Sequence, residues 1–368
     1  MTEKGPRPIG RVDAFQRKHT VVSFPISVIY KYFDDQGAYL SAIITYYAFI
    51  AIFPLLLLGT SILGFILQGN EGLRDTLLDS ALSQFPIIGD QLGRPEGLQG
   101  STGAIIVGAV TATYGAMGLG QALQNAANIA WSVPRNSRAN PFLLRFRSLA
   151  LLLISGIGIV ALAITTSVLA NTDTLGTDLK PAIQRIVQVA SFVLTVMIFA
   201  AVFRLVSLGR ARLRAVLPGA FVTGLLWQAL QWVGNTYVRE VIGKADSQVN
   251  QTFALVLGLV AFIYIASIMV VLGLEVNVVL RRHLYPRALL TPFTDNVILT
   301  EADQKAYAAY AKAQRHKGFE SVEVTFKERP PREPRNASAT TQELPREEPP
   351  ESREQAGTAA KDATVEMP

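Results

Sequence analysis

Long stretches without a charged residue are the dominant pattern of this chain. Six of them contain at least 18 consecutive residues without Asp, Glu, Lys or Arg, and apolar residues make up most of each stretch. They cover residues 36–70, 97–134, 148–172, 186–203, 215–238 and 247–274. About 20 apolar residues in a helix cross a hydrocarbon core of about 30 Å, and charge-free stretches of this length are rare in soluble proteins. The pattern predicts six membrane-spanning helices.

The fold class follows from these runs. Membrane barrels use strands of about 10 alternating apolar and polar residues, whereas Pro54–Leu58 and Leu149–Ile154 are continuously apolar. We therefore predict an all-α integral membrane protein with a six-helix transmembrane domain over residues 36–283. The expected spans cover residues 38–67, 102–129, 147–170, 186–208, 215–238 and 253–280.

Three segments flank this domain. Residues 1–35 are basic and aromatic, as is typical of a segment that lies at the membrane interface. Residues 284–327 are expected to be partly helical and cytoplasmic. Residues 328–368 are rich in Pro, Glu, Arg, Ser and Thr, with almost no apolar side chains to bury, so we expect a disordered tail.

The loop charges predict the orientation. Lys and Arg number 14 on the side that holds the N-terminal segment and the second and fourth connections, against 6 in the alternate connections. Basic loops stay in the cytoplasm, so both termini are predicted to be cytoplasmic. The first span is the expected insertion signal and stays in the protein.

The composition excludes several kinds of function. Half of the residues are hydrophobic, only 17% are charged, and there is no cysteine. The net charge of +6 is explained by membrane orientation without a nucleic-acid partner. The chain has no phosphate-binding loop and no His-Glu-x-x-His motif, and its three histidines all lie in predicted cytoplasmic segments. We expect no enzyme activity, no metal and no cofactor.

Two predicted spans carry amide side chains spaced so that each set lies on one helix face. They are Gln121, Gln124, Asn125 and Asn128 in the second span, and Gln228, Gln231 and Asn235 in the fifth. Both segments share the pattern Gln-Ala-Leu-Gln-x-x-x-Asn, which is compatible with a 3+3 inverted repeat. The two stripes either line a common cavity that forms a substrate path or make hydrogen bonds that hold helices together. The sequence leaves both interpretations open.

Two further features concern helix packing. Small residues recur at every fourth position of the second span, where they allow another helix to approach closely, either in the bundle or from a second subunit. They are Ala104, Gly108, Ala112, Ala116 and Gly120. Pro54 removes a helix hydrogen bond in the first span, and it is a candidate hinge or a static kink.

Glu275 is the only acidic residue inside the six predicted spans. It lies near the end of the sixth span, at a depth similar to that of Arg204 near the end of the fourth. An unpaired carboxylate there is costly, so we expect Glu275 to pair with Arg204, with Asn277 near the same cytoplasmic opening. A static pair, a gate and a proton-coupling carboxylate remain alternatives.

Three segments resemble a known family. The first span has the sequence LSAIITYYAFIAIFP from Leu40, the fifth begins near Leu217-Pro218-Gly219-Ala220, and the sixth ends with LGLEVNVVLRRHLYPRAL from Leu272. In this order and spacing they resemble the YihY/BrkB family of bacterial inner-membrane proteins, over residues 25–290. The resemblance implies a six-helix protein connected with envelope integrity and suspected of transport. Members have carried the name ribonuclease BN, but this chain offers no cluster of carboxylates or imidazoles for such a reaction.

The sequence therefore supports three hypotheses of unequal weight. The first is a transporter or flippase whose partners are membrane lipid and an amphipathic, lipid-like envelope component. The second is a membrane scaffold that moves no molecule. A ribonuclease is the remote third.

Overall fold

The structure of the chain, a computed structural model, describes residues 10–66, 72, 102–170, 180–207, 212–244, 248–295 and 297–327. At some helical positions it describes the backbone alone, as in residues 56–66, 102–109 and 166–170. Every regular element in the described ranges is a helix. The predicted all-α class is therefore confirmed for these residues.

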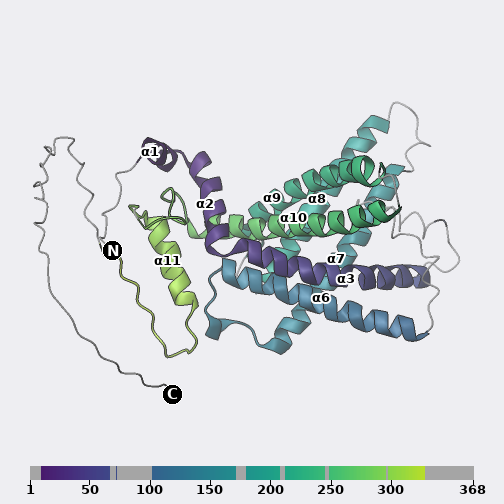
Figure 1. Cartoon of the computed structure of the whole chain (residues 1–368), viewed down its shortest axis with the longest axis horizontal. Helices are drawn as coiled ribbons and strands as arrows, with labels where there is room; N and C mark the ends of the chain where they lie inside the picture. The colour runs from purple at the N-terminus through teal and green to yellow at the C-terminus, as the bar shows by residue number, and fades with distance from the viewer. Residues whose placement is uncertain are drawn as a thin grey trace, which may run out of the picture. The chain divides into compact units, whose positions relative to one another are not determined.

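Six long helices account for most of the described chain (Figure 1). They are α3 (Gly37–Ile66), α6 (Thr102–Ala130), α7 (Pro141–Ala170), α8 (Lys180–Val206), α9 (Leu213–Tyr237) and α10 (Gln248–Arg282). Their ranges follow the six charge-free stretches closely. Inside a membrane the backbone has no water to bond with, and a helix satisfies all of its own backbone hydrogen bonds. The shorter elements are α1 (Arg11–Lys18), α2 (Thr20–Asp34), the 3-10 helix η2 (Arg135–Ser137), the π-helix η4 (Val238–Ile242) and α11 (Glu301–Ala313).

Four helices in the described part are long and apolar enough to cross a membrane. They cover Pro141–Thr165, Ala182–Val206, Leu213–Ile242 and Phe253–Arg282. In α3, Gly37–Ile52 forms a shorter apolar segment. These helices make the chain a multi-pass membrane protein.

Small residues allow neighbouring helices to pack closely in antiparallel pairs. A Cβ atom at Gly115 of α6 would lie 2.9 Å from the backbone of Ala51 in α3. One at Gly158 of α7 would lie 2.8 Å from the side chain of Ile198 in α8. The ends of α6, α8 and α10 meet at Trp131, which donates to the hydroxyl of Ser207 and accepts from Arg282. Because α7 and α9 begin a few residues after α6 and α8 end, consecutive long helices alternate in direction. We call the end where α3, α7 and α9 begin and α6, α8 and α10 end the polar end of the bundle.

The small-residue pattern of α6 is used inside the chain where its side chains are described. Ala116 is buried, and a Cβ atom at Gly120 would lie 2.6 Å from the Cβ atom of Ser148 in α7. The side chains of Ala104, Gly108 and Ala112 lie outside the described part. The same holds for the side chain of Pro54, although the helical backbone of α3 continues through this residue.

The outer surface of the bundle is strongly apolar. Ile157 of α7, Ile186 of α8, Trp232 of α9 and Leu257 of α10 are each at least 65% exposed. Water-soluble proteins rarely expose so many large apolar side chains, whereas a lipid-facing surface requires them.

The N-terminal segment and the segment after α10 also contain helices. α1 and α2 expose apolar side chains such as Phe15, Val21 and Phe33, and Phe33 lies edge-on to the ring of Phe293. α11 begins at a capping box in which Thr300 and Asp303 each bond to the other's backbone. The tail predicted to be disordered, residues 328–368, lies outside the described residues.

Candidate functional site

Two of the motifs that carry the family resemblance meet between α9 and α10. The backbone N–H of Gly219 donates a 2.7 Å hydrogen bond to the side-chain oxygen of Asn277. The helices touch so closely that a Cβ atom at Gly219 would lie 2.0 Å from the carbonyl oxygen of Gly273. A Cβ atom at Gly273 would in turn lie 1.9 Å from the hydroxyl of Thr223. Asn277 is thus a structural residue that fixes α9 against α10.

A buried lysine lies beside this contact region, at the polar end of the bundle. Lys31 of α2 forms a short ion pair with Asp35 and donates a 3.0 Å hydrogen bond to the carbonyl of Ala130, at the end of α6. Its ammonium nitrogen also lies 3.4 Å from a carboxylate oxygen of Glu275 in α10. The ring of Tyr310 in α11 covers the ammonium at 5.0 Å. Lys31 therefore connects four helices.

A second buried cation lies in the segment after α10. Arg287 binds Asp34, at the end of α2, at 2.5 Å, and Asp303 of α11 at 2.7 Å. Its guanidinium also lies 5.3 Å from the ring centroid of Tyr307. The backbone carbonyl of Arg287 accepts a hydrogen bond from Gln16 of α1. We call the groups around Lys31 and Arg287 the ion cluster.

Burial changes the ionisation of the groups outside the spans. It raises the pKa of Tyr310, and the carboxylates of Asp35 and Asp34 raise this pKa further. Burial alone would lower the pKa of Arg287, but the carboxylates of Asp34 and Asp303 outweigh it and raise the pKa. Tyr310 is therefore neutral and Arg287 charged across the physiological range.

The predicted partner of Glu275 was wrong. Arg204 is exposed on α8, whereas Glu275 is fully buried and faces Lys31. An arginine near the end of a span can extend its guanidinium to the interface, so it does not need a buried acid. Lys31 was counted in the sequence only as an orientation signal, although its position four residues before Asp35 in an aromatic, apolar segment suggested a buried pair.

The residues of the two amide stripes differ in their surroundings. Gln124 is buried, and its side-chain NH2 group lies within hydrogen-bond distance of the carbonyls of Gly120 and Leu144 and of the hydroxyl of Ser148, so it joins α6 to α7. The other positions differ in exposure: Asn128 is buried, Gln231 is half-buried, and Gln121, Asn125, Gln228 and Asn235 are exposed. Asn125 accepts a 3.4 Å hydrogen bond from Arg138. At Gln124 the stripe holds helices together.

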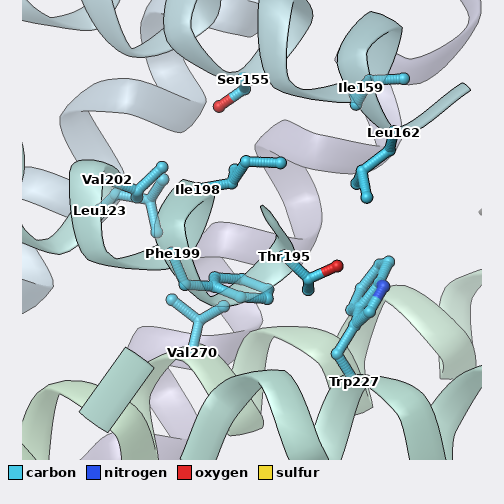
Figure 2. A pocket seen from close by; sticks show the side chains of 10 residues that line it. All are labelled: Leu123, Ser155, Ile159, Leu162, Thr195, Ile198, Phe199, Val202, Trp227 and Val270. Carbon is cyan, nitrogen blue, oxygen red and sulfur yellow. The ribbon is translucent and has the colours of Figure 1, made fainter. Parts of the chain in front are cut away.

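A cavity of about 200 Å³ lies between five of the long helices, and none of the seven stripe residues lines it. Figure 2 shows Ser155 and Ile159 on one side of this space and Trp227 and Val270 on the other. Eight of its ten lining residues are apolar. The full set is Leu123, Ser155, Ile159, Leu162, Thr195, Ile198, Phe199, Val202, Trp227 and Val270. The hydroxyl of Thr195 donates to the carbonyl of Ser191, as is usual for a hydroxyl inside a helix. The cavity suits an apolar occupant.

The family model described as virulence factor BrkB matches residues 28–294. The chain belongs to this family. The match includes Lys31, Glu275 and Arg287 and ends before α11, so the BrkB-family region contains the cations of the ion cluster but not Asp303. No curated protein and no solved structure matches the chain. Among the described residues, no three His, Asp or Glu side chains gather to hold a metal ion.

Proposed function

We propose that this BrkB-family chain is a six-span protein of the bacterial cytoplasmic membrane that moves an amphipathic, lipid-like envelope component. Both ends of the chain lie in the cytoplasm in this proposal, and the exposed apolar side chains of α1 and α2 lie at the membrane interface. The family match and the apolar outer surface support the location.

The cavity is the observation that carries the transport function. Four of the five helices that line it are long and apolar enough to cross a membrane, and its walls are mostly apolar. Such walls favour an acyl chain over a polar solute, because an unpaired polar group there would lose its hydrogen bonds to water. Ser155, Thr195 and Trp227 supply the polar groups beside which a headgroup or linkage would pass.

A scaffold is the alternative, and one observation favours it. Gln124 makes its hydrogen bonds inside the protein, and the ion cluster ties α1, α2 and α11 to the bundle. These are the contacts of a rigid support. A scaffold requires no movement of lipid between leaflets.

Lipid movement by the purified protein separates the two functions. The full chain is reconstituted in liposomes that carry a fluorescent lipid in both leaflets, and a membrane-impermeant quencher reports exchange between them. Ser155→Phe fills the cavity and should reduce the exchange rate at least tenfold. Gly156→Phe is the matched control, because Gly156 is exposed and a Cβ atom there meets nothing within 4 Å.

The outcomes are distinct. Exchange that is fast with wild-type protein and Gly156→Phe but slow with Ser155→Phe supports transport through the cavity. Wild-type liposomes that exchange lipid no faster than protein-free liposomes, for fluorescent analogues of each main envelope lipid, support the scaffold.

A further inference from the structure

Two buried carboxylates, those of Asp35 and Glu275, lie beside the single ammonium group of Lys31. The side chains of Lys31, Asp35 and Glu275 are each at most 1% exposed, so water does not solvate their charges. Asp35 holds Lys31 directly, while Glu275 lies at 3.4 Å. Within the described part of the chain, neither carboxylate oxygen of Glu275 accepts a hydrogen bond.

The wider surroundings do not remove this excess. Arg282 of α10 interacts electrostatically with Asp35, but it donates its hydrogen bond to the backbone carbonyl of Trp131. Arg287 is held between Asp34 and Asp303. Tyr310 contributes a neutral ring. Within the described ranges, the charged groups of the ion cluster are therefore three cations and four carboxylates: Lys31, Arg282 and Arg287 against Asp34, Asp35, Glu275 and Asp303.

We propose that Glu275 holds a proton, so that the polar end of the bundle contains a proton-binding site beside Lys31. Two carboxylates that share one site do not both ionise when the site is buried, because the second negative charge has neither water nor a cation of its own. The proton resides on Glu275, because Asp35 has the direct ion pair.

Loss of this proton changes the contacts of Lys31. Asp35 and the carbonyl of Ala130 take two of the three N–H groups of the ammonium, and an ionised Glu275 would draw the third toward itself. Asp35 follows α2, Ala130 ends α6, and Glu275 belongs to α10. Protonation therefore changes how α2 is held against the bundle. That this step drives transport rests on the proposed function, whereas proton binding itself does not.

Infrared spectroscopy of the full-length protein tests proton binding directly. An un-ionised carboxylic acid has a C=O stretching band that an ionised carboxylate lacks, and this band shifts on exchange into heavy water. Wild-type protein near pH 7 should show one such band from a buried acid, although an ordinary glutamate is ionised there. The band should disappear in Glu275→Gln. It should remain in Glu301→Gln, the matched control, since the Glu301 side chain is 90% exposed.

A second variant tests whether the ion pair of Asp35 with Lys31 keeps Glu275 protonated. Asp35→Asn leaves Glu275 as the carboxylate partner of Lys31, so Glu275 should ionise and the band should be lost. Glu275→Gln imitates the protonated acid and should fold with at least wild-type thermal stability. A missing wild-type band, a band that persists in Glu275→Gln or in Asp35→Asn, or a Glu275→Gln protein that fails to fold would each overturn the proposal.

The same variants link the site to transport. If lipid exchange is coupled to this proton, the exchange rate of wild-type protein changes with pH, and that of Glu275→Gln does not. Wild-type protein with the infrared band but without any lipid exchange would remove the proposed function and keep the proton site. Lipid exchange without the infrared band would remove the proton site and keep the proposed function.

Discussion

Asn277 and Gly219 join the two helices whose motifs support the family resemblance. The side-chain oxygen of Asn277 accepts the backbone hydrogen bond of Gly219 at 2.7 Å, at a place where glycines bring α9 and α10 into backbone contact. No larger residue at position 219 would leave room for this contact, and a hydrocarbon side chain at 277 could not accept the bond. The two motifs are thus parts of one helix–helix contact.

Asn277→Leu should therefore destabilise the bundle. It keeps a similar volume but leaves the buried N–H of Gly219 without its acceptor, which costs about 1–3 kcal/mol of unfolding free energy. The midpoint of thermal unfolding in detergent should fall by several degrees. Asn235→Leu is the control, because Asn235 is exposed on α9 and its replacement should change stability by less than about 0.5 kcal/mol. Equal effects of the two substitutions would contradict this role for Asn277.

Arg287 should contribute more to stability than any exposed ion pair. Arg287→Met leaves the carboxylates of Asp34 and Asp303 buried without their cation, a loss of about 3–5 kcal/mol. The matched change is Lys305→Met, which removes a solvent-exposed pair with Glu301 and should cost at most about 1 kcal/mol. Thermal unfolding of both variants measures the difference. An Arg287→Met protein as stable as Lys305→Met would mean that the ion cluster does not hold the N-terminal helices and α11 in place.

Tyr310 should make stability fall at alkaline pH. Burial, with the nearby carboxylates of Asp35 and Asp34, raises the pKa of this phenol in the folded protein, while an unfolded tyrosine ionises near pH 10. Above about pH 10 the folded state therefore holds a proton that the unfolded state has lost, so this contribution to stability decreases as the pH rises. Tyr310→Phe should flatten the decrease between about pH 10 and pH 11, whereas Tyr46→Phe, an exposed position on α3, should not. Parallel curves for wild type and Tyr310→Phe would contradict this assignment.

The helices could be predicted from the sequence because one large free-energy cost, that of a charge inside the membrane, decides where they lie. A charge inside a membrane is costly, so the gaps between charges mark where helices can lie, and α6 at Thr102–Ala130 matches the predicted 102–129 closely. α7 instead begins at Pro141, before the predicted start at residue 147. Proline suits the first position of a helix, and Arg145 and Arg147 can extend to the interface.

The ion cluster could not be predicted, because its contacts join distant parts of the chain. Lys31 and Glu275 are separated by most of the spans, and Arg287 meets Asp34 and Asp303 from two further segments. Arg204 was predicted as the partner of Glu275 only because the two residues lie at a similar depth in their spans. Only the packing of α2 onto α10 shows that Lys31, and not Arg204, reaches Glu275.

The contacts between loops and the positions of Lys and Arg together predict the orientation of the chain in the membrane. Arg138 and Lys312 must lie on one side of the membrane, because residues 135 and 136 hydrogen-bond to residues 314 and 315. Arg212 precedes α9 at the same polar end, while Lys244 follows η4 at the other end. Since basic loops stay inside, a reporter that is active only outside the cytoplasm should be inactive after Arg138, Arg212 and Lys312 and active after Lys244.

Fusions after Asp90 and Asp178, in connections outside the described residues, should also be active, which extends the test to all six spans. Activity after Arg138, Arg212 and Lys312 together would invert the orientation without changing the fold. Activity after Lys312 but not after Arg138 would be incompatible with six spans, because an even number of crossings between residue 138 and residue 312 must return the chain to the same side.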